Sequence, residues 1–358
     1  MDNLLACGAA PDLDVAALGR WLAQRLDGFR GPLRARRFEG GQSNPTYLLE
    51  AGERRCVLRS KPGPAARLLP SAHAIEREYA VMRALADGEV PVPRMLLLCE
   101  DESVIGRAFY LMDHVAGRVL WEQALPGLPR EERAALYDEM NRVIAALHRV
   151  DFAARGLGGY GKPGNYFERQ IGRWTRQYRA CSGPHGAAPI EAMERLMDWL
   201  PAHLPAGARD DAQTTIVHGD YRLDNLVFHP SEPRILAVLD WELSTLGHPL
   251  ADFSYHCMSW RIAPGVFRGL GGLDLGALGI PGERDYIARY CRRTGRSPDA
   301  LEADWGFYLA YNLFRMAGIL QGIAKRVIDG TAASDRAREA AGAARPLAEL
   351  GWTIACAG

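Results

Sequence analysis

The sequence predicts an α+β protein with two lobes: a small β-rich N-terminal lobe over residues 1–115 and a larger, mainly helical C-terminal lobe over residues 116–358. The chain of 358 residues exceeds the usual size of a single hydrophobic core, which favours two lobes. Short strand-like segments separated by glycine-containing turns occupy much of the first third. After Gly117 the apolar pattern becomes mainly helical.

Two helices are expected among the strands of the first lobe. Asp12 can cap a helix that runs to about Phe29. Ser71 can cap a second helix that runs to about Asp87 and is closed by Gly88. We expect a small antiparallel sheet with one inserted helix over residues 30–115. Its strand-like segments are residues 33–39, 46–50, 55–60, 95–100 and 107–115.

The second lobe is expected to be helical around a short β insert at residues 214–240. Residues 262–282 are rich in glycine and proline, which favours a loop. The segments with a helical pattern are residues 129–150, 164–182, 189–202, 250–259, 283–294, 301–328 and 334–349.

Composition excludes several classes of function. The chain has 43 Lys and Arg against 43 Asp and Glu, so its formal net charge of zero argues against nonspecific nucleic-acid binding. Its seven cysteines are scattered, with no C-x-x-C pair, which is typical of reduced cytosolic thiols. No signal peptide and no apolar run of membrane-spanning length are visible, so we expect a soluble cytoplasmic protein that does not bind a membrane.

The strongest chemical signal is a pair of apolar runs that each end in a carboxylate. His218-Gly-Asp220 is followed by Asn225, and a second run leads into Asp240 fifteen residues later. One aspartate, Asp220, can orient an attacking hydroxyl while Asn225 and Asp240 hold Mg²⁺ against a polyphosphate, as phosphoryl transfer requires. The alternative is a polar turn between two strands. The strand end Leu-Asp-Trp-Glu gains nothing structurally from two acids, which favours the chemical interpretation.

Phosphate-binding candidates lie upstream. The turn that contains Gly41 and Ser43 can offer N–H groups and a hydroxyl to phosphate oxygens, although an ordinary hairpin turn fits equally well. Arg59, on a predicted strand, can pair with phosphates and with a helix carboxylate. We expect that carboxylate to be Glu78, because it lies on the apolar face of its helix and an acid there needs a cation. A surface pair is the alternative for both, and Lys61 is the rival cation.

Residues 108–117 resemble a buried edge strand that leaves the sheet. In a two-lobed kinase this connector, here Met112, Asp113 and Val115, offers backbone groups to adenine, but an ordinary strand has the same pattern. Residues 162–179 carry five basic residues and one acid, with aromatic residues interleaved. They fit either a solvated basic helix face or the wall of a cleft for an anionic substrate.

Taken together, these residues resemble the aminoglycoside phosphotransferase/choline kinase superfamily, a branch of the bilobal protein-kinase-like fold. The resemblance covers nearly the whole chain, and its most specific parts are residues 218–225 and 239–252. Three further stretches, residues 57–63, 69–79 and 164–174, resemble the kinase-like domains fused to, or encoded beside, certain acyl-CoA dehydrogenases.

That resemblance implies phosphorylation of a hydroxyl that depends on ATP and Mg²⁺, with 4-hydroxyacyl-CoA as the leading substrate type. It implies that Asp220 is the catalytic base, that Asn225 and Asp240 are metal ligands, and that Arg59 is the strand cation. An acyl-CoA dehydrogenase would be a partner in the same pathway, acting in trans.

The sequence departs from some relatives and leaves other functions open. Arg59 stands where many relatives have lysine, and the absence of D-F-G and A-P-E motifs disfavours a protein substrate. An aminoglycoside- or choline-type kinase would require acidic walls for its cationic substrates, and the basic segment 162–179 argues mildly against it. A nucleotide-binding pseudokinase with a regulatory role is opposed by Asp220, which a pure binder does not need.

Overall fold

In the computed structural model the chain forms two compact units. The described residues are 7–29, 31–38, 44–63, 74–184, 186–331 and 335–357. Unit 1 comprises residues 1–120, 153–157 and 224–244, and unit 2 comprises residues 121–152, 158–223 and 245–358. The two units therefore alternate along the sequence, and one of the points at which the chain passes from one unit to the other lies just after Leu223.

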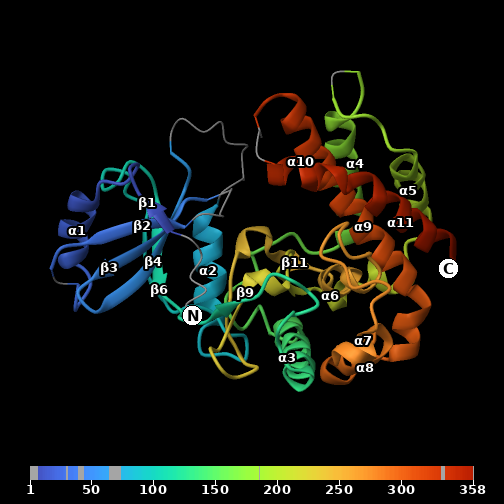
Figure 1. Ribbon diagram of the computed structural model, residues 1–358, viewed down its shortest axis with the longest axis horizontal. Coiled ribbons are helices and arrows are strands. Elements are labelled where there is room, and N and C mark those ends of the chain that lie inside the picture. The colour runs from blue at the N-terminus through green and yellow to red at the C-terminus, as the bar shows by residue number, and fades with distance from the viewer. Residues whose placement is uncertain are drawn as a thin grey trace. The chain divides into compact units, whose positions relative to one another are not determined.

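Unit 1 is built on a six-stranded antiparallel sheet with the order β1-β2-β3-β4-β6-β5 (Figure 1). Its strands are β1 Cys7–Ala9, β2 Arg34–Phe38, β3 Thr46–Ala51, β4 Arg54–Ser60, β5 Met95–Cys99 and β6 Phe109–Asp113. The predicted strands are present, and β1 adds one that was not predicted. The edge position predicted for the strand at residues 108–117 is wrong, because β6 lies between β4 and β5, whereas its predicted burial is confirmed.

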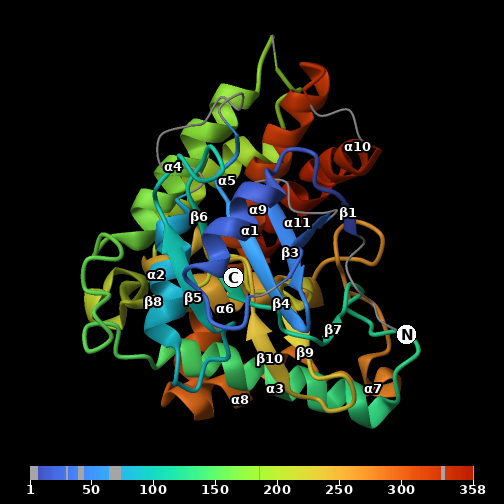
Figure 2. The same cartoon turned by 90° about the vertical axis from the view of Figure 1, so that its left-hand side faces the viewer.

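Helix α1, Val15–Ala23, packs on one face of this sheet, and in Figure 2 it lies in front of the strands. Its N-cap is Asp14, whose Oδ1 accepts the Ala17 N–H at 2.9 Å, so the prediction of Asp12 as the cap is wrong. Asp12 instead accepts a hydrogen bond from the Tyr47 hydroxyl at 2.5 Å. The helix also ends six residues before Phe29.

Helix α2, Ile75–Leu85, lies on the opposite face of the sheet, next to β5 and β6 (Figure 1). It begins after Ala74, and the predicted cap Ser71 lies outside the described residues. At its end Asp87 has the left-handed backbone, with φ of 60°, so the expectation that Gly88 closes the helix is wrong. Successive side chains of β4 point to opposite faces of the sheet. Leu58 therefore packs with α1 on one face, whereas Arg59 projects from the other face and contacts Glu78 of α2.

A second, three-stranded sheet completes unit 1, with the antiparallel order β10-β9-β7. Its strands are β7 Arg118–Val119, β9 Leu226–Phe228 and β10 Ile235–Val238. A Cβ on Gly117 would lie 2.3 Å from the Phe228 carbonyl oxygen, so the close approach of β7 to β9 requires glycine there. The prediction of one β insert at 214–240 is wrong in one respect, because β8, Thr215–Val217, pairs with β11, Thr245–Gly247, inside unit 2.

Unit 2 is mainly helical, and α9 is its central element (Figure 1). Helices α4, α6 and α11 pack against α9, which explains why most of its side chains are buried. The α+β class predicted from the sequence is confirmed. The helices are α3 Arg130–His148, α4 Tyr166–Cys181, α5 Glu191–Ala202, α6 Pro249–Cys257, α7 Leu275–Leu278, α8 Glu283–Thr294, α9 Pro298–Ile328, α10 Asp335–Gly342 and α11 Ala344–Ala357.

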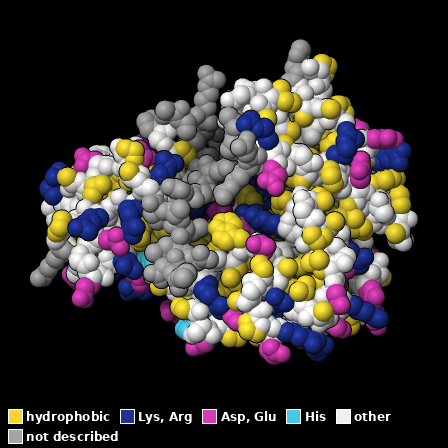
Figure 3. Space-filling view, viewed as in Figure 1, with side chains coloured by type: hydrophobic (Ala, Val, Ile, Leu, Met, Phe, Trp, Pro, Cys, Tyr) yellow, Lys and Arg dark blue, Asp and Glu magenta, His cyan; other side chains and the backbone are white. Residues whose placement is uncertain are grey.

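Two predictions for this unit need correction. The helix predicted at residues 334–349 is two helices, α10 and α11, and the loop predicted at residues 262–282 contains the short helix α7. Within the described residues, the structure has no helix with the length and apolar character needed to cross a bilayer. Basic and acidic side chains are interspersed over the face shown in Figure 3, as a net charge of zero leads one to expect.

Candidate active site

In unit 1 the Arg59 guanidinium is surrounded by carboxylates. Its Nε lies 3.0 Å from Glu78 Oε2, and one terminal nitrogen lies 2.8 Å from Asp240 Oδ1 and 3.2 Å from Glu242 Oε2. The side chain of Arg59 is only 12% exposed. The expected pairing of Arg59 with Glu78 is therefore present, and the rival cation Lys61 pairs with another acid of α2, Glu76.

Glu78 is the most deeply buried acid of this group, with 1% of its surface exposed. It accepts hydrogen bonds from Asn44 Nδ2 at 2.9 Å and from the Tyr110 hydroxyl at 3.1 Å. Burial raises the pKa of Glu78 to about 7, and the nearby Asp240 and Glu242 carboxylates act in the same direction against Arg59. One cation thus faces three carboxylates, which leaves the group attractive to a further positive charge.

Asn225 and Asp240 flank the β9–β10 hairpin. The Leu239 N–H donates to the Asn225 carbonyl at 2.8 Å, so Asn225 lies opposite the residue that precedes Asp240. Asp240 has a left-handed backbone, with φ of 65° and ψ of 59°. Such a conformation costs a non-glycine residue on the order of 1 kcal/mol or more, and aspartate is among the residues that tolerate it best. The residue after Asp240, buried Trp241, is anchored by its indole N–H, which donates to the Val238 carbonyl.

The chemistry of these two side chains fits Mg²⁺. The carboxylate of Asp240 and the amide oxygen of Asn225 are hard oxygen donors, and Mg²⁺ commonly takes one or two carboxylates together with water and substrate phosphates. Among the described residues there is no group of three or more His, Cys, Asp and Glu that could hold a metal ion by itself. Two oxygen ligands from the protein would leave the remaining positions around Mg²⁺ to water and phosphate oxygens.

In unit 2, both oxygens of Asp220 have a neighbouring donor. The Tyr255 hydroxyl donates to Oδ1 at 2.5 Å, and the Nε of Arg222 lies 3.1 Å from Oδ2. The Asp220 N–H donates to Nδ1 of buried His218 at 3.2 Å, so this histidine supports the loop. The Asp220 side chain is 16% exposed, which leaves it accessible to a small molecule.

Asp252 of α6 anchors the loop that carries Asp220. Its carboxylate accepts the N–H groups of His218 and Gly219 at 2.7 and 2.8 Å, and it lies 3.3 Å from Nε2 of His148. Burial alone would raise the pKa of Asp252, but the His148 interaction and the His218 N–H hold that pKa below its usual value. These contacts give Asp252 a role of structural support for the loop.

Arg315 of α9 and Tyr255 of α6 are two site residues that sequence reasoning missed. Arg315 donates to the Gly219 carbonyl at 2.5 Å, and its guanidinium lies 5.0 Å from the Tyr255 ring centre and 5.7 Å from that of Trp174. Arg315 is only 8% exposed. A lone basic residue in the apolar run from Leu313 to Ala317 was the available signal, because a buried cation requires a specific partner.

Among the described residues, the predicted site residues Met112, Asp113 and Val115 are not brought into these groups. Gly41 and Ser43 lie outside the described residues. The Asp113 N–H already donates to the Arg94 carbonyl at 2.9 Å, which engages one backbone group expected to face adenine. Met112 is buried in β6, and Val115 packs against the small apolar cluster of the second sheet.

The basic segment predicted at 162–179 includes most of α4. Its aromatic residues Phe167, Trp174 and Tyr178 are buried, whereas Arg173 and Arg176 are exposed. This arrangement favours a solvated basic face over the wall of a substrate cleft.

Comparison with known proteins gives a consistent picture. Residues 34–303 match a family model described as the phosphotransferase enzyme family. Acyl-CoA dehydrogenase family member 10 of Mus musculus is 47% identical over 91% of this chain and 29% of that protein. Acyl-CoA dehydrogenase family member 11 of Homo sapiens is 40% identical over 95% of this chain and 43% of that protein. The chain thus spans less than half the length of these curated relatives.

Solved structures show the same architecture. A Ralstonia eutropha JMP134 protein, provisionally assigned as an aminoglycoside phosphotransferase, is 59% identical, with a TM-score of 0.86 over 96% of this chain and 99% of that chain. A microcompartment-associated aminopropanol kinase is 21% identical, with a TM-score of 0.61 over 95% and 99%. Aminoglycoside phosphotransferase APH(4)-Ia, in a ternary complex with AMP-PNP and hygromycin B, is 16% identical, with a TM-score of 0.58 over 94% and 98%. The last two show the fold alone.

Proposed function

Because the chain belongs to the phosphotransferase enzyme family, we propose that it transfers the γ-phosphoryl group of ATP to the hydroxyl of a small anionic acceptor. Membership identifies a phosphotransferase that acts on hydroxyl groups. The predicted resemblance to this superfamily, and to the kinase-like domains that accompany acyl-CoA dehydrogenases, is confirmed. The nucleotide, the metal and the acceptor are the proposed parts.

The observation that carries the proposal is the environment of Asp220. Donors near both of its oxygens, and a loop anchored by Asp252 and Arg315, hold its carboxylate in one orientation, which supports a role as the base for an acceptor hydroxyl. The hydroxyl oxygen would form the new bond to the γ-phosphorus while the bond from that phosphorus to the β–γ bridging oxygen breaks and ADP leaves. The proton of the hydroxyl passes to Asp220 and then to solvent.

Asn225 and Asp240 would hold Mg²⁺, which when bound neutralises charge on the phosphates. Arg59 is the proposed phosphate cation, because it contacts Asp240 directly, whereas Lys61 pairs with Glu76. Glu78 would fix the orientation of Arg59, since both side chains are largely buried. The backbone of Met112, Asp113 and Val115 as an adenine site has weaker support, because the Asp113 N–H is already engaged.

We propose a hydroxyacyl-CoA as the leading acceptor, because curated relatives at 40–47% identity are named acyl-CoA dehydrogenase family members. A dehydrogenase in the same pathway would be the partner. An aminoglycoside acceptor is the alternative, favoured by the provisional assignment of the 59% identical protein. The cations Arg222 and Arg315 near Asp220 argue against a polycationic acceptor.

A screen of acceptor-dependent ADP release tests the proposal. Hydroxyacyl-CoAs, aminoglycosides, choline and sugars would each be assayed with wild type and with Asp220→Ala. We expect release with a hydroxyacyl-CoA that Asp220→Ala reduces by at least 10³-fold, on the order of a lost base together with its positioning. ATP binding should persist in Asp220→Ala.

Asp240→Ala provides the complementary variant, because it should remove the Mg²⁺-dependent part of nucleotide binding. Metal-independent nucleotide binding of normal strength would contradict the role of Asp240. If wild type binds ATP but releases no ADP with any acceptor, the chain behaves as a nucleotide-binding regulator and the proposed function is wrong.

A further inference from the structure

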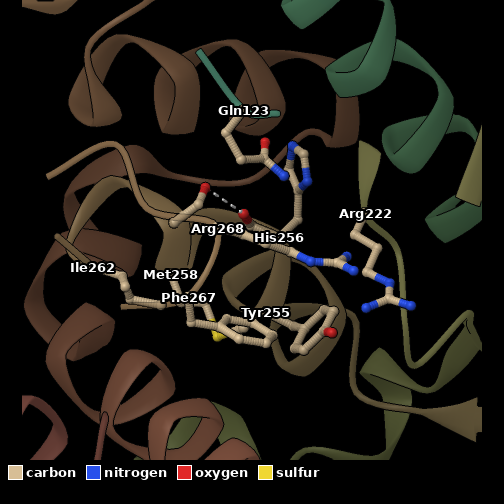
Figure 4. Close-up of a pocket in the computed structure, with 9 residues that line it drawn as sticks. Gln123, Arg222, Tyr255, His256, Met258, Ile262, Phe267 and Arg268 are labelled. Atoms are coloured by element: carbon tan, nitrogen blue, oxygen red, sulfur yellow. Dashed lines mark hydrogen bonds between the residues drawn. The ribbon is translucent and has the colours of Figure 1, made fainter. Parts of the chain in front are cut away.

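A small pocket, partly open to solvent, lies within unit 2, beside α6 (Figure 4). Its walls come from the end of α6, from the turn that follows it, and from the segment that leads to Arg268. The residues that matter for its chemistry are Arg222, Tyr255, Met258, Ile262, Phe267 and Arg268.

The pocket shares two of its walls with the candidate base. Tyr255 donates to Asp220 Oδ1 at 2.5 Å, and Arg222 Nε lies 3.1 Å from Asp220 Oδ2. A molecule in the pocket therefore contacts the same two side chains that hold Asp220. Because these contacts are direct, the reacting hydroxyl and the occupant of the pocket can belong to one small molecule.

The polar lining of the pocket is positive. Arg222 and Arg268 both line it, and none of its nine lining residues is acidic. His256, a third titratable residue of the lining, stays neutral near pH 7, because burial lowers its pKa to about 4. In the view of Figure 4, the Arg268 side chain extends toward the side of the pocket on which Arg222 lies. Two guanidinium groups in one small concave site favour an anion.

The rest of the lining is apolar. Ile262 and Met258 are buried, with 1% and 4% of their surfaces exposed, and Phe267 packs beside Arg268, whose guanidinium lies 5.7 Å from the ring centre. Such a surface suits a short carbon chain.

We propose that this pocket is the acceptor subsite, in which Arg268 binds an anionic group of the acceptor and Met258, Ile262 and Phe267 bind its short carbon chain. The inference rests on the proposed function and refines it by naming the side chain that selects the acceptor. The anion is either the carboxylate of a free hydroxy acid or a phosphate of its coenzyme A thioester, and the two sources share the same recognition by a guanidinium.

Arg268 is the position to vary, because Arg222 contacts Asp220 itself. Arg268 has a left-handed backbone, with φ of 38°, so Arg268→Asn removes the charge with a residue that tolerates this conformation. Arg268→Lys keeps the charge. Arg284→Gln, on α8, is the matched control, because its side chain is 85% exposed and its loss changes net charge by the same amount.

The acceptors are 4-hydroxypentanoate, its coenzyme A thioester and its neutral N-methylamide. We expect Arg268→Asn to lower kcat/KM at least tenfold for the anionic acceptor and less than threefold for the amide, as loss of a charge-assisted hydrogen bond predicts. Arg268→Lys should recover part of that loss, and neither Arg284→Gln nor the KM for ATP should change. A loss confined to the thioester identifies its phosphates as the anion, and a loss with the free acid identifies the carboxylate.

Calorimetric binding of the two anionic probes without nucleotide separates this inference from the proposed function. If the probes bind wild type and not Arg268→Asn, the subsite is present even when ADP release fails. If neither probe binds wild type, or if Arg268→Asn binds and turns over both as well as Arg284→Gln does, the inference is overturned.

Discussion

Removing the guanidinium of Arg59 should destabilise the protein strongly. Arg59→Ala deletes the cation that lies within 3.2 Å of Glu78, Asp240 and Glu242. The two outer acids, with side chains that are 30% and 24% exposed, can be solvated by water after the change. Glu78 cannot, because it is 1% exposed, so the cost falls mainly on this residue.

The magnitude follows from this burial. Breaking a buried ion pair by removing one partner costs about 3–5 kcal/mol of unfolding free energy, because a charge is left uncompensated. Glu78 has a partial escape, since burial already raises its pKa to about 7 and loss of Arg59 raises it further. The carboxyl can then remain protonated in the folded state. Its unfolded form ionises near pH 4.5, so the destabilisation should grow with pH, by up to about 1.4 kcal/mol per pH unit until the folded pKa is passed.

Urea denaturation of four proteins measures this effect: wild type, Arg59→Ala, Glu78→Gln and the double variant, each at pH 6.0 and 8.5. Glutamine carries no charge and keeps one acceptor oxygen, so it can accept from either Asn44 or Tyr110, which donate to different oxygens of Glu78. The double variant should therefore be more stable than Arg59→Ala alone at pH 8.5. The double-mutant cycle then gives the coupling energy between the two side chains.

A surface ion pair would give a different result. Exposed pairs contribute about 0–1 kcal/mol and are screened by salt. If Arg59→Ala costs less than about 1 kcal/mol at both pH values, and the cycle is additive, then Arg59 and Glu78 do not form a buried couple. The assignment of Arg59 as an oriented phosphate cation would lose its structural basis.

Two further outcomes follow from unit 2. Tyr255→Phe removes the hydrogen bond to Asp220 and should lower kcat about 10- to 100-fold in an ADP-release assay, while ATP affinity stays unchanged. A fall in ATP affinity with normal kcat would contradict the role of Tyr255 in holding Asp220. Burial lowers the pKa values of His248 and His256 to about 4, so the unfolded chain binds their protons first as the pH falls. Unfolding free energy should therefore decrease by about 1.4 kcal/mol per pH unit for each histidine as the pH falls from 6.5 to 4. In urea titrations, His256→Gln should make the dependence of unfolding free energy on pH less steep. A dependence unchanged from that of wild type would show that His256 does not have a lowered pKa in the folded protein.

Local patterns in the sequence predicted most of the elements and one important contact. Alternation along β4 and the 3.6-residue period of α2 were enough to pair Arg59 with Glu78, because Glu78 occupies the otherwise apolar face of its helix and an acid there needs a cation. Helix caps were less predictable. Asp12 and Asp14 are equivalent by residue type, and the choice between them depends on Tyr47, which approaches Asp12 from a distant strand.

Predictions failed where tertiary contacts decide the outcome. β6 looks like an edge strand in isolation, and its interior place depends on β5, which forms the edge of the sheet beyond it. Tyr255 and Arg315 reach the loop of Asp220 from 35 and 96 residues farther along the chain. No local period can reveal such contacts. Only the unusual position of Arg315 in an apolar helix indicated that a partner had to exist.

The residues of the motif at 218–240 are divided between the two units. Asp220 and Asn225 are five residues apart, yet Asp220 belongs to unit 2, whereas Asn225 and Asp240 belong to unit 1. Asp220 is supported by Asp252, Tyr255 and Arg315, and Asp240 is supported by Arg59 and Trp241, each set lying within its own unit. Because the supports are separate, substitutions in one set should act on acceptor turnover and those in the other on the metal and nucleotide.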